Sequence, residues 1–456
     1  MMKSDMTEQT FRNFARTPRR FALPAMMALA LSGCGIFGGD GPAKTPTVGN
    51  REPVLSRIEA GAQVDPALAT VAVVIPPQQV NAEWSQAGGT ASKSYGHLAI
   101  GDTPSEIWSA RIAGSGNQRR LAAAPVVGGE SLYAVDTDGI VHAFDANSGA
   151  KLWTYRMPVP GRIQSSAFGG GASYSNGRLY ATNGVGDVVA LDARSGEPIW
   201  TAKPSGPLRG APTIAFNAVF VMTQDNQIYS LNAADGEVLW NDSGSIGQAG
   251  VFGVAAPAAG QGTVIAGYSS GELAAYRYEN GRELWLDSLA RTSISTEVGA
   301  LTDVDADPII DNGRVYALGQ GGRMAAYELV TGQRIWELNL AGISTPAVAG
   351  EWIFTLTDDA RLLAIARSTG KVRWLTQLQQ WRDAEDKEGP IFWTGPVLAG
   401  NRLWVANSRG LLMSVDVQTG IASMFRDIDN AVSLPPIVAN RTLYVLDDDG
   451  TIHAYR

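Results

Sequence analysis

Residues 138–153 read DGIVHAFDANSGAKLW and decide the fold. The segment from Ile140 to Asp145 places its side chains alternately on two faces, and a period of two residues is typical of a β-strand. An Asn-Ser-Gly sequence then ends at Gly149, a residue type that tolerates the positive φ of a tight turn. A second short strand ends at Trp153. The stretch therefore predicts a β-hairpin that carries one large aromatic side chain near its end.

The same unit recurs along the rest of the chain, in residues 186–200, 226–240, 271–285, 322–336, 360–374 and 410–424. The six complete copies end in Trp residues that lie 38 to 51 positions apart, whereas the copy that ends at Met424 has lost its Trp. An eighth copy begins at Gly450 and stops at Arg456, before its turn and last strand. Units of this length contain about four short strands, and such units arranged radially form a β-propeller.

We therefore expect an all-β fold, an eight-bladed β-propeller of four-stranded antiparallel blades. The eighth unit lacks its outermost strand, and the segment from Pro104 to Trp108 has the matching pattern. This N-terminal strand near Trp108 is predicted to complete the last blade. Closing the ring in this way removes exposed strand edges that would otherwise favour aggregation.

The first 33 residues are typical of a secretory signal. A basic region precedes the apolar stretch 21–31, which is too short to span a bilayer as a helix. It ends in Leu31-Ser32-Gly33-Cys34, which resembles a bacterial lipobox. Cys34 is the only cysteine in the chain, so it is the predicted lipidation site and no internal disulfide can form.

Three parts are expected from this pattern: a lipoprotein signal peptide (1–33), a lipidated flexible tether (34–80) and the propeller (81–456). Proline and glycine are frequent in the tether, which would let the propeller stand away from the membrane. The residue after the cysteine is Gly35 rather than the aspartate that commonly retains lipoproteins in the inner membrane, which favours the outer membrane. The net charge of −8 argues against nucleic-acid binding.

The repeat, with its Asp-Ala-x-Ser/Thr-Gly-x-x-x-Trp core, resembles that of pyrroloquinoline-quinone-type propellers. Together with the lipobox and eight units, the chain is similar to the BamB family of lipoproteins in the outer-membrane β-barrel assembly machinery. The resemblance implies a non-enzymatic scaffold, lipid-anchored in the outer membrane and facing the periplasm. It also implies binding to the periplasmic POTRA domains of BamA, the barrel-forming subunit, and contact with unfolded outer-membrane proteins.

Two segments match partner-binding motifs of that family. The first, around Leu208 and Arg209, resembles its Leu-Arg-Gly loop, and the second, with Asp303 and Asp305, resembles its Asp-Val-Asp loop. Both are expected on loops between blades, with Leu208 exposed as an apolar anchor and the carboxylates available to basic groups of a partner. Gly206 stands where the family often has another Leu. The alternative is that Arg209 pairs with a nearby Asp and only holds two loops together.

The main rival interpretation is a quinoprotein-like envelope dehydrogenase or a ligand-binding propeller. Quinoprotein enzymes typically use a vicinal disulfide, which a chain with one cysteine cannot form. The acidic turns at Asp136 and Asp447 lack the later ligands of a calcium loop and are interpreted as turn chemistry. His142 and His453 occupy equivalent repeat positions, which favours a role on a strand face over metal binding. We therefore expect no cofactor and no metal.

The charged stretch 379–389 is longer than its counterparts in the other units. A solvated loop is the default interpretation. The alternative is a second contact surface for a partner or for peptidoglycan.

Overall fold

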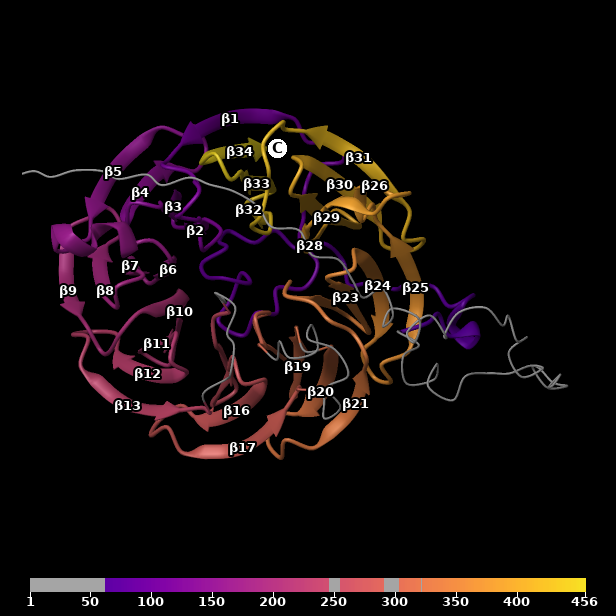
Figure 1. Cartoon of the computed structure of the whole chain (residues 1–456), viewed down its shortest axis with the longest axis horizontal. Helices are drawn as coiled ribbons and strands as arrows, with labels where there is room; N and C mark the ends of the chain where they lie inside the picture. The colour runs from indigo at the N-terminus through magenta and orange to yellow at the C-terminus, as the bar shows by residue number, and fades with distance from the viewer. Residues whose placement is uncertain (1–61, 246–254, 291–302, 321) are drawn as a thin grey trace, which may run out of the picture. The chain divides into compact units, whose positions relative to one another are not determined.

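The computed structural model describes residues 62–245, 255–290, 303–320 and 322–456, which all belong to one unit, Leu55–Arg456. The described residues contain two short 3-10 helices, η1 (Pro66–Leu68) and η2 (Gly161–Ser166), and neither is long enough to cross a bilayer. The described strands form eight four-stranded antiparallel sheets around a common centre (Figure 1). The predicted all-β, eight-bladed propeller is confirmed.

Each blade runs from an innermost strand to an outermost one, and the strands of the first four blades follow in that order. Blade one contains β2 (Val126–Gly128), β3 (Ser131–Val135), β4 (Ile140–Asp145) and β5 (Lys151–Arg156). Blade two contains β6 (Ala172–Ser175), β7 (Arg178–Thr182), β8 (Val188–Asp192) and β9 (Pro198–Ala202). Blade three contains β10 (Leu208–Ala215), β11 (Ala218–Thr223), β12 (Gln227–Asn232) and β13 (Val238–Ser243). Blade four contains β14 (Ala258–Gly260), β15 (Thr263–Gly267), β16 (Glu272–Arg277) and β17 (Glu283–Ser288).

The second half of the ring repeats this order. Blade five contains β18 (Ile309–Asp311), β19 (Arg314–Gly319), β20 (Arg323–Glu328) and β21 (Arg334–Leu338). Blade six contains β22 (Ala347–Ala349), β23 (Trp352–Leu356), β24 (Arg361–Ala366) and β25 (Val372–Gln377). Blade seven contains β28 (Trp393–Ala399), β29 (Arg402–Asn407), β30 (Leu411–Asp416) and β31 (Ala422–Asp427). A separate hairpin, β26 (Trp381–Asp383) and β27 (Glu388–Pro390), lies between blades six and seven in the sequence.

Blade eight is built from both ends of the propeller. Its first three strands are β32 (Ile437–Ala439), β33 (Thr442–Leu446) and β34 (Thr451–Tyr455), and its outermost strand is β1 (Glu106–Arg111). β1 pairs antiparallel with β34, and Trp108 lies opposite Ala454 (Figure 1). The predicted closure of the ring by the strand near Trp108 is therefore confirmed.

The repeated Trp joins each blade to the next. In blade one, Trp153 Nε1 donates to the Ala193 carbonyl of blade two over 3.1 Å. Gly196, in the turn of blade two, has φ +75°, and a Cβ placed on it would lie 2.6 Å from the Trp153 ring. The turn glycine is thus required both for its backbone conformation and for the close approach of the indole. The same donation recurs from Trp108, Trp200, Trp240, Trp285, Trp336 and Trp374.

The missing Trp of blade seven has a structural explanation. The third and fourth strands of blade eight, β34 and β1, are not consecutive in the chain, so no hairpin turn with a glycine joins them for a Trp to cover. Met424, at the Trp position, is 69% exposed. Its neighbour Phe425 instead packs edge-on against Trp404 and Tyr455, with ring centroids 5.0 and 5.5 Å away. Aromatic packing thus replaces the indole contact at this boundary.

Residues 79–100, which we call the crossing segment, run through the centre of the ring and bond to the innermost strands (Figure 1). Their backbone pairs with Val127 of blade one, and the Gln86 side chain bonds to Ile214 of blade three. Further backbone bonds reach Tyr174, Ala259, Ile310, Gly400 and Asn440, in blades two, four, five, seven and eight. The crossing segment thereby satisfies polar groups on the inner edges of the sheets.

The chain just before the crossing segment also contacts the propeller, although it was predicted to be tether. Asp65 N donates to Val372 O on β25 over 2.9 Å. Val73 is fully buried, and its backbone exchanges two hydrogen bonds with the Gln418 side chain. Residues 62–80 are therefore held against blades six and seven rather than free. The remainder of the predicted tether, 34–61, and the signal peptide lie outside the described residues.

Candidate functional site

A cavity of about 760 Å³ opens at the centre of the propeller. It is lined by the connections that enter the innermost strands of blades one, five, six, seven and eight, and by turns between the second and third strands of blades five, seven and eight. Trp84 and Tyr95 of the crossing segment also line it, and their rings are 4.8 Å apart. A volume of this size is typical of sites for small organic ligands. The crossing segment therefore converts the propeller centre into a lined cavity.

Blade five supplies carboxylates to this cavity. Asp305 and Asp307 line it, and the Ala256 amide donates to Asp307 Oδ1 over 2.8 Å. Burial raises the pKa of Asp307, while the charge of Lys93 acts in the opposite direction. Lys93 is almost fully buried and donates to Ala87 O and Thr213 Oγ1 over 2.9 and 3.1 Å. Burial lowers the pKa of Lys93, partly offset by the attraction of Asp307.

The first predicted partner motif is less exposed than expected. Leu208 is 0% exposed and packs in a cluster with Tyr180, Val188 and other side chains of blades two and three. Leu208 also begins β10, so the motif starts a strand rather than lying wholly on a loop. The expectation of an exposed Leu208 anchor is therefore wrong. Arg209 pairs through its backbone with Met222, and its side chain lies outside the described part of the structure.

The second motif, Asp303 to Asp305, lies between blades four and five. Asp303 is 0% exposed and Asp305 is 8% exposed, so neither carboxylate is widely accessible. Between them, Val304 packs against Gly267 and its amide donates to Tyr268 O. The Asp303 carbonyl accepts from the amide of Gln320 over 2.9 Å. These bonds fix the motif's backbone, and Asp305 is the member that reaches the cavity.

The two motifs approach the same opening. Ala211, two residues after Arg209, lines the cavity that Asp305 also lines, although blade four separates the motifs in the sequence. The lipidation candidate Cys34 lies outside the described residues. Among the described residues, no three His, Cys, Asp or Glu side chains cluster as metal ligands would.

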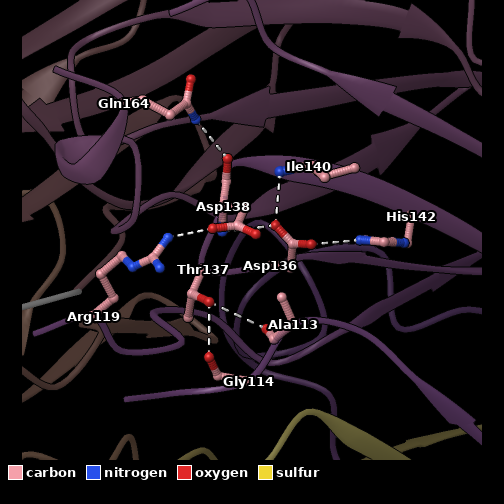
Figure 2. A network of polar contacts seen from close by, with 9 residues as sticks. All are labelled: Ala113, Gly114, Arg119, Asp136, Thr137, Asp138, Ile140, His142 and Gln164. Atoms are coloured by element: carbon pink, nitrogen blue, oxygen red, sulfur yellow. Dashed lines mark hydrogen bonds and ion pairs between the residues drawn. The ribbon is translucent and has the colours of Figure 1, made fainter. Parts of the chain in front are cut away.

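The acidic turn at Asp136 is held together by its own hydrogen bonds (Figure 2). Asp136 Oδ1 accepts from the amides of Asp138 and Ile140, and Oδ2 lies 2.7 Å from His142 Nε2. Asp447 accepts in the same way from the Thr451 amide and lies 3.4 Å from His453 Nε2. Both acidic segments thus make hydrogen bonds within their own turns.

The site features that sequence reasoning missed are the crossing segment and the cavity that it lines. The Glu-Trp-Ser-Gln sequence at residues 83–86 is unlike the repeats and was the one available signal. Its partners are backbone groups on blades that lie far along the chain, such as Ile214, which is 128 residues from Gln86 and bonds to it. No residue pattern marks such backbone partners.

The family model described as "Outer membrane protein assembly factor BamB" matches residues 90–166 and 137–376. The chain belongs to the BamB family. The protein of that name from Yersinia pestis is 25% identical over 77% of this chain and 89% of its own length. The relative from Escherichia coli K12 is 26% identical over 77% of this chain and 88% of its own length. Family membership carries with it an assembly-factor role at the outer membrane.

Solved structures agree on the fold. BamB from Moraxella catarrhalis superposes with a TM-score of 0.65 at 20% identity, covering 77% of this chain and 99% of that one. A quinohemoprotein alcohol dehydrogenase from Comamonas testosteroni also reaches 0.65, at 14% identity, covering 82% of this chain and 80% of that one. Because scaffolds and enzymes share the architecture, the fold alone does not assign the activity.

Proposed function

We propose that the chain is a non-enzymatic scaffold lipoprotein of the outer-membrane β-barrel assembly machinery, which binds the POTRA domains of BamA and assists outer-membrane protein insertion. The observation that carries the proposal is the convergence of two family motifs on one opening. Ala211, next to the Leu-Arg-Gly segment, and Asp305, of the Asp-Val-Asp segment, line the same cavity. A rigid partner domain could therefore contact both segments at once.

The buried and accessible members of the motifs have different roles in this proposal. Leu208 and Asp303 are buried, so they fix the backbone of the interface rather than touch the partner. Pro207 is exposed beside Leu208, and Asp305 reaches the cavity. Direct contact is therefore assigned to Pro207 and Asp305, and the match to the family motif adds Arg209. Charged contacts of this kind govern the orientation and rate of association more than affinity.

Anchoring belongs to the same proposal. Cys34 is the residue assigned to lipidation, after removal of residues 1–33. The chain would then be tethered to the inner leaflet of the outer membrane and face the periplasm. Residues 62–80 contact the propeller, and the rest of the proposed tether, 34–61, lies outside the described residues.

A pull-down with the periplasmic domains of BamA tests the interface. The paired variants Leu208→Ala/Arg209→Ala and Asp303→Ala/Asp305→Ala are expected to lose most of the bound partner. Single Arg209→Ala and Asp305→Asn variants separate contact from folding, because neither removes a buried apolar group. Arg194→Ala, exposed in a turn of blade two, is the matched control. Undiminished binding in both pairs would remove the interface assignment.

The quinoprotein alternative predicts a different outcome in a simpler experiment. Addition of pyrroloquinoline quinone with Ca²⁺ should leave the melting temperature unchanged if the chain is a scaffold. A ligand at 100-fold its Kd stabilises a protein by roughly 2.7 kcal/mol, which a thermal melt detects readily. A large upward shift would favour the dehydrogenase interpretation.

The outer strands favour direct contact with unfolded client strands as a second role. Six blades expose Leu or Ile directly before the repeated Trp, namely Ile107, Leu152, Ile199, Leu239, Leu284 and Ile335. Blade six has Arg373 there, and its outer strand already pairs in parallel with Val64 of the N-terminal segment. One outer edge therefore pairs with an extended segment, and the outer strands of six other blades carry exposed apolar side chains at the equivalent position.

An unfolded outer-membrane barrel peptide with a fluorescent label tests this role by anisotropy. Leu239→Lys/Leu284→Lys should weaken binding on the order of 10-fold, because it places two charges against apolar client side chains. Val330→Lys/Ile421→Lys also charges two exposed aliphatic positions, but neither precedes a Trp. Equal losses for both variants would show a nonspecific charge effect and reject the edge assignment.

A further inference from the structure

One side of the central cavity carries a group of apolar side chains next to the charged Arg120 and Asp448. The apolar residues come from the connections that enter blades one, seven and eight and from the first residues of β28 and β32, and they include Leu121, Phe392, Trp393, Val432, Leu434 and Ile437. Phe392 is 65% exposed, although it sits at the edge of a cavity that could cover it. A large aromatic side chain that keeps this much exposed surface gains free energy when a ligand removes that surface from water.

The charged insertion holds this aromatic edge in place. At the open end of the hairpin β26–β27, the Ile391 amide donates a hydrogen bond to Gln380 O over 2.9 Å. Trp393 Nε1 donates to Gln379 O over 2.8 Å, and the Phe392 amide donates to Ser408 Oγ over 3.1 Å. The insertion therefore holds the Trp393 side chain and Ser408 holds the backbone of Phe392, so less of the freedom of Trp393 remains to be lost on binding.

Blade five presents hydrogen-bond acceptors to the same cavity. The carboxylates of Asp305 and Asp307 line it, and so does Gln320. Within the described residues, Gln320 Oε1 is buried and accepts no hydrogen bond. A buried acceptor without a donor costs about 1–3 kcal/mol, so a ligand N–H placed there would recover that free energy. Asp307 already has Lys93 as a nearby cation, but Asp305 brings a further carboxylate to the cavity, and a carboxylate favours a donor that is positively charged.

From this arrangement we infer that the central cavity is a binding site for a ligand that joins an aromatic or aliphatic body to a protonated amine. The apolar body lies against Phe392 and Trp393, and the amine donates toward Gln320 and the carboxylates of blade five. The crossing segment lines the cavity through Trp84 and Tyr95, so the ligand contacts blades and crossing segment together.

This site goes beyond the proposed scaffold function and does not need it. Its apolar contacts are remote in sequence from the two partner motifs, and only Asp305 belongs to both. The same chemistry could be supplied by a free amine or by a lysine next to an aromatic residue in a polypeptide. The experiment therefore includes both sources.

Calorimetric titration of the full chain with 2-(2-naphthyl)ethylamine tests the free-amine source. Its uncharged analogue, 2-(2-naphthyl)ethanol, and its anionic analogue, 2-naphthylacetate, test the need for the charge. We expect the amine to bind on the order of 10-fold more tightly than the alcohol, and the anion more weakly still. The peptides acetyl-Phe-Lys-Phe-amide and acetyl-Phe-Glu-Phe-amide repeat the comparison for a polypeptide source.

Two substitutions locate the site. Phe392→Ser should weaken binding of the amine on the order of 10-fold, and Gln320→Met should reduce the preference of amine over alcohol. Ile421→Ser is the matched control, because Ile421 is also 65% exposed but does not line the cavity. Absence of binding by every probe, equal affinity for amine, alcohol and anion, or equal effects of Phe392→Ser and Ile421→Ser would each overturn the inference. The BamA pull-down is a separate measurement, so failure of the ligand-site inference would leave the proposed partner interface untouched, and the reverse also holds.

Discussion

Leu208 illustrates how a motif residue can act through the fold. It is fully buried between blades two and three, so Leu208→Ala should destabilise the protein by about 2–5 kcal/mol through the cavity it leaves. Denaturant unfolding measures this loss. Leu239→Ala removes an equally large side chain from an exposed strand position and should change stability by less than about 0.5 kcal/mol. Equal stabilities for the two variants would contradict the burial of Leu208.

The protonation of His453 should make the stability of the closed ring depend on pH. Its hydrogen bond with Asp447, opposed by burial, raises the pKa of His453, and Glu106 on the closing strand β1 adds to the effect. A raised folded-state pKa means that the stabilisation is complete below the unfolded value of about 6.5 and is lost as pH rises through the folded value.

Melting temperatures measured from pH 6 upward should therefore fall for the wild-type chain through the folded-state pKa of His453. His453→Gln keeps a polar side chain but cannot be protonated, so its melting temperature should fall less over the same range. The two chains should converge at high pH, where His453 is neutral. A larger pH dependence in the variant than in the wild type would contradict the assignment.

At the scale of the element, two turn glycines allow the free-energy cost of backbone strain to be measured separately from the cost of a steric clash with the Trp ring. Gly196 and Gly177 have almost the same φ, +75° and +77°, but only Gly196 faces a Trp ring. Gly177→Ala should therefore cost about 1–2 kcal/mol from backbone strain alone. Gly196→Ala should cost about 1–3 kcal/mol more, because the new methyl group displaces Trp153. Urea unfolding measures both, and equal losses would show that the Trp contact does not constrain the turn.

These hairpin elements were the part of the structure that could be predicted from sequence. Strand alternation, the turn glycine and the Trp are all local signals, and they repeat often enough to count the blades. The closing strand at Trp108 could be found because it copies the missing part of the eighth unit. The exposure of Leu208 could not be predicted, because it depends on side chains such as Tyr180 that come from another blade.

At the scale of the whole molecule, the path of the crossing segment cannot be predicted from the repeat pattern. It bonds to innermost strands of seven blades among the described residues, largely through backbone groups. Every residue type offers those groups, so composition does not reveal such pairing. The proline-rich stretch before it was predicted to be tether for the same reason. The central cavity was consequently missed, because its lining depends on where this segment runs.

One segment that joins several blades should also couple their local stabilities. Trp84 is 4% exposed, packs against Tyr95 and pairs with Val127 of blade one. Trp84→Ala should cost about 3–5 kcal/mol, whereas Val80→Ala, at a position that is 50% exposed in the same segment, should cost less than about 0.5 kcal/mol.

The coupling itself appears in hydrogen exchange. The amides of Ala259 and Ile310, in blades four and five, donate to carbonyls of the crossing segment. If Trp84→Ala loosens the whole segment, these amides should exchange faster although they lie on other blades than Val127. Val80→Ala should leave them unchanged. Faster exchange restricted to blade one would show instead that each blade binds its part of the crossing segment independently, and that the segment does not couple the local stabilities of the blades.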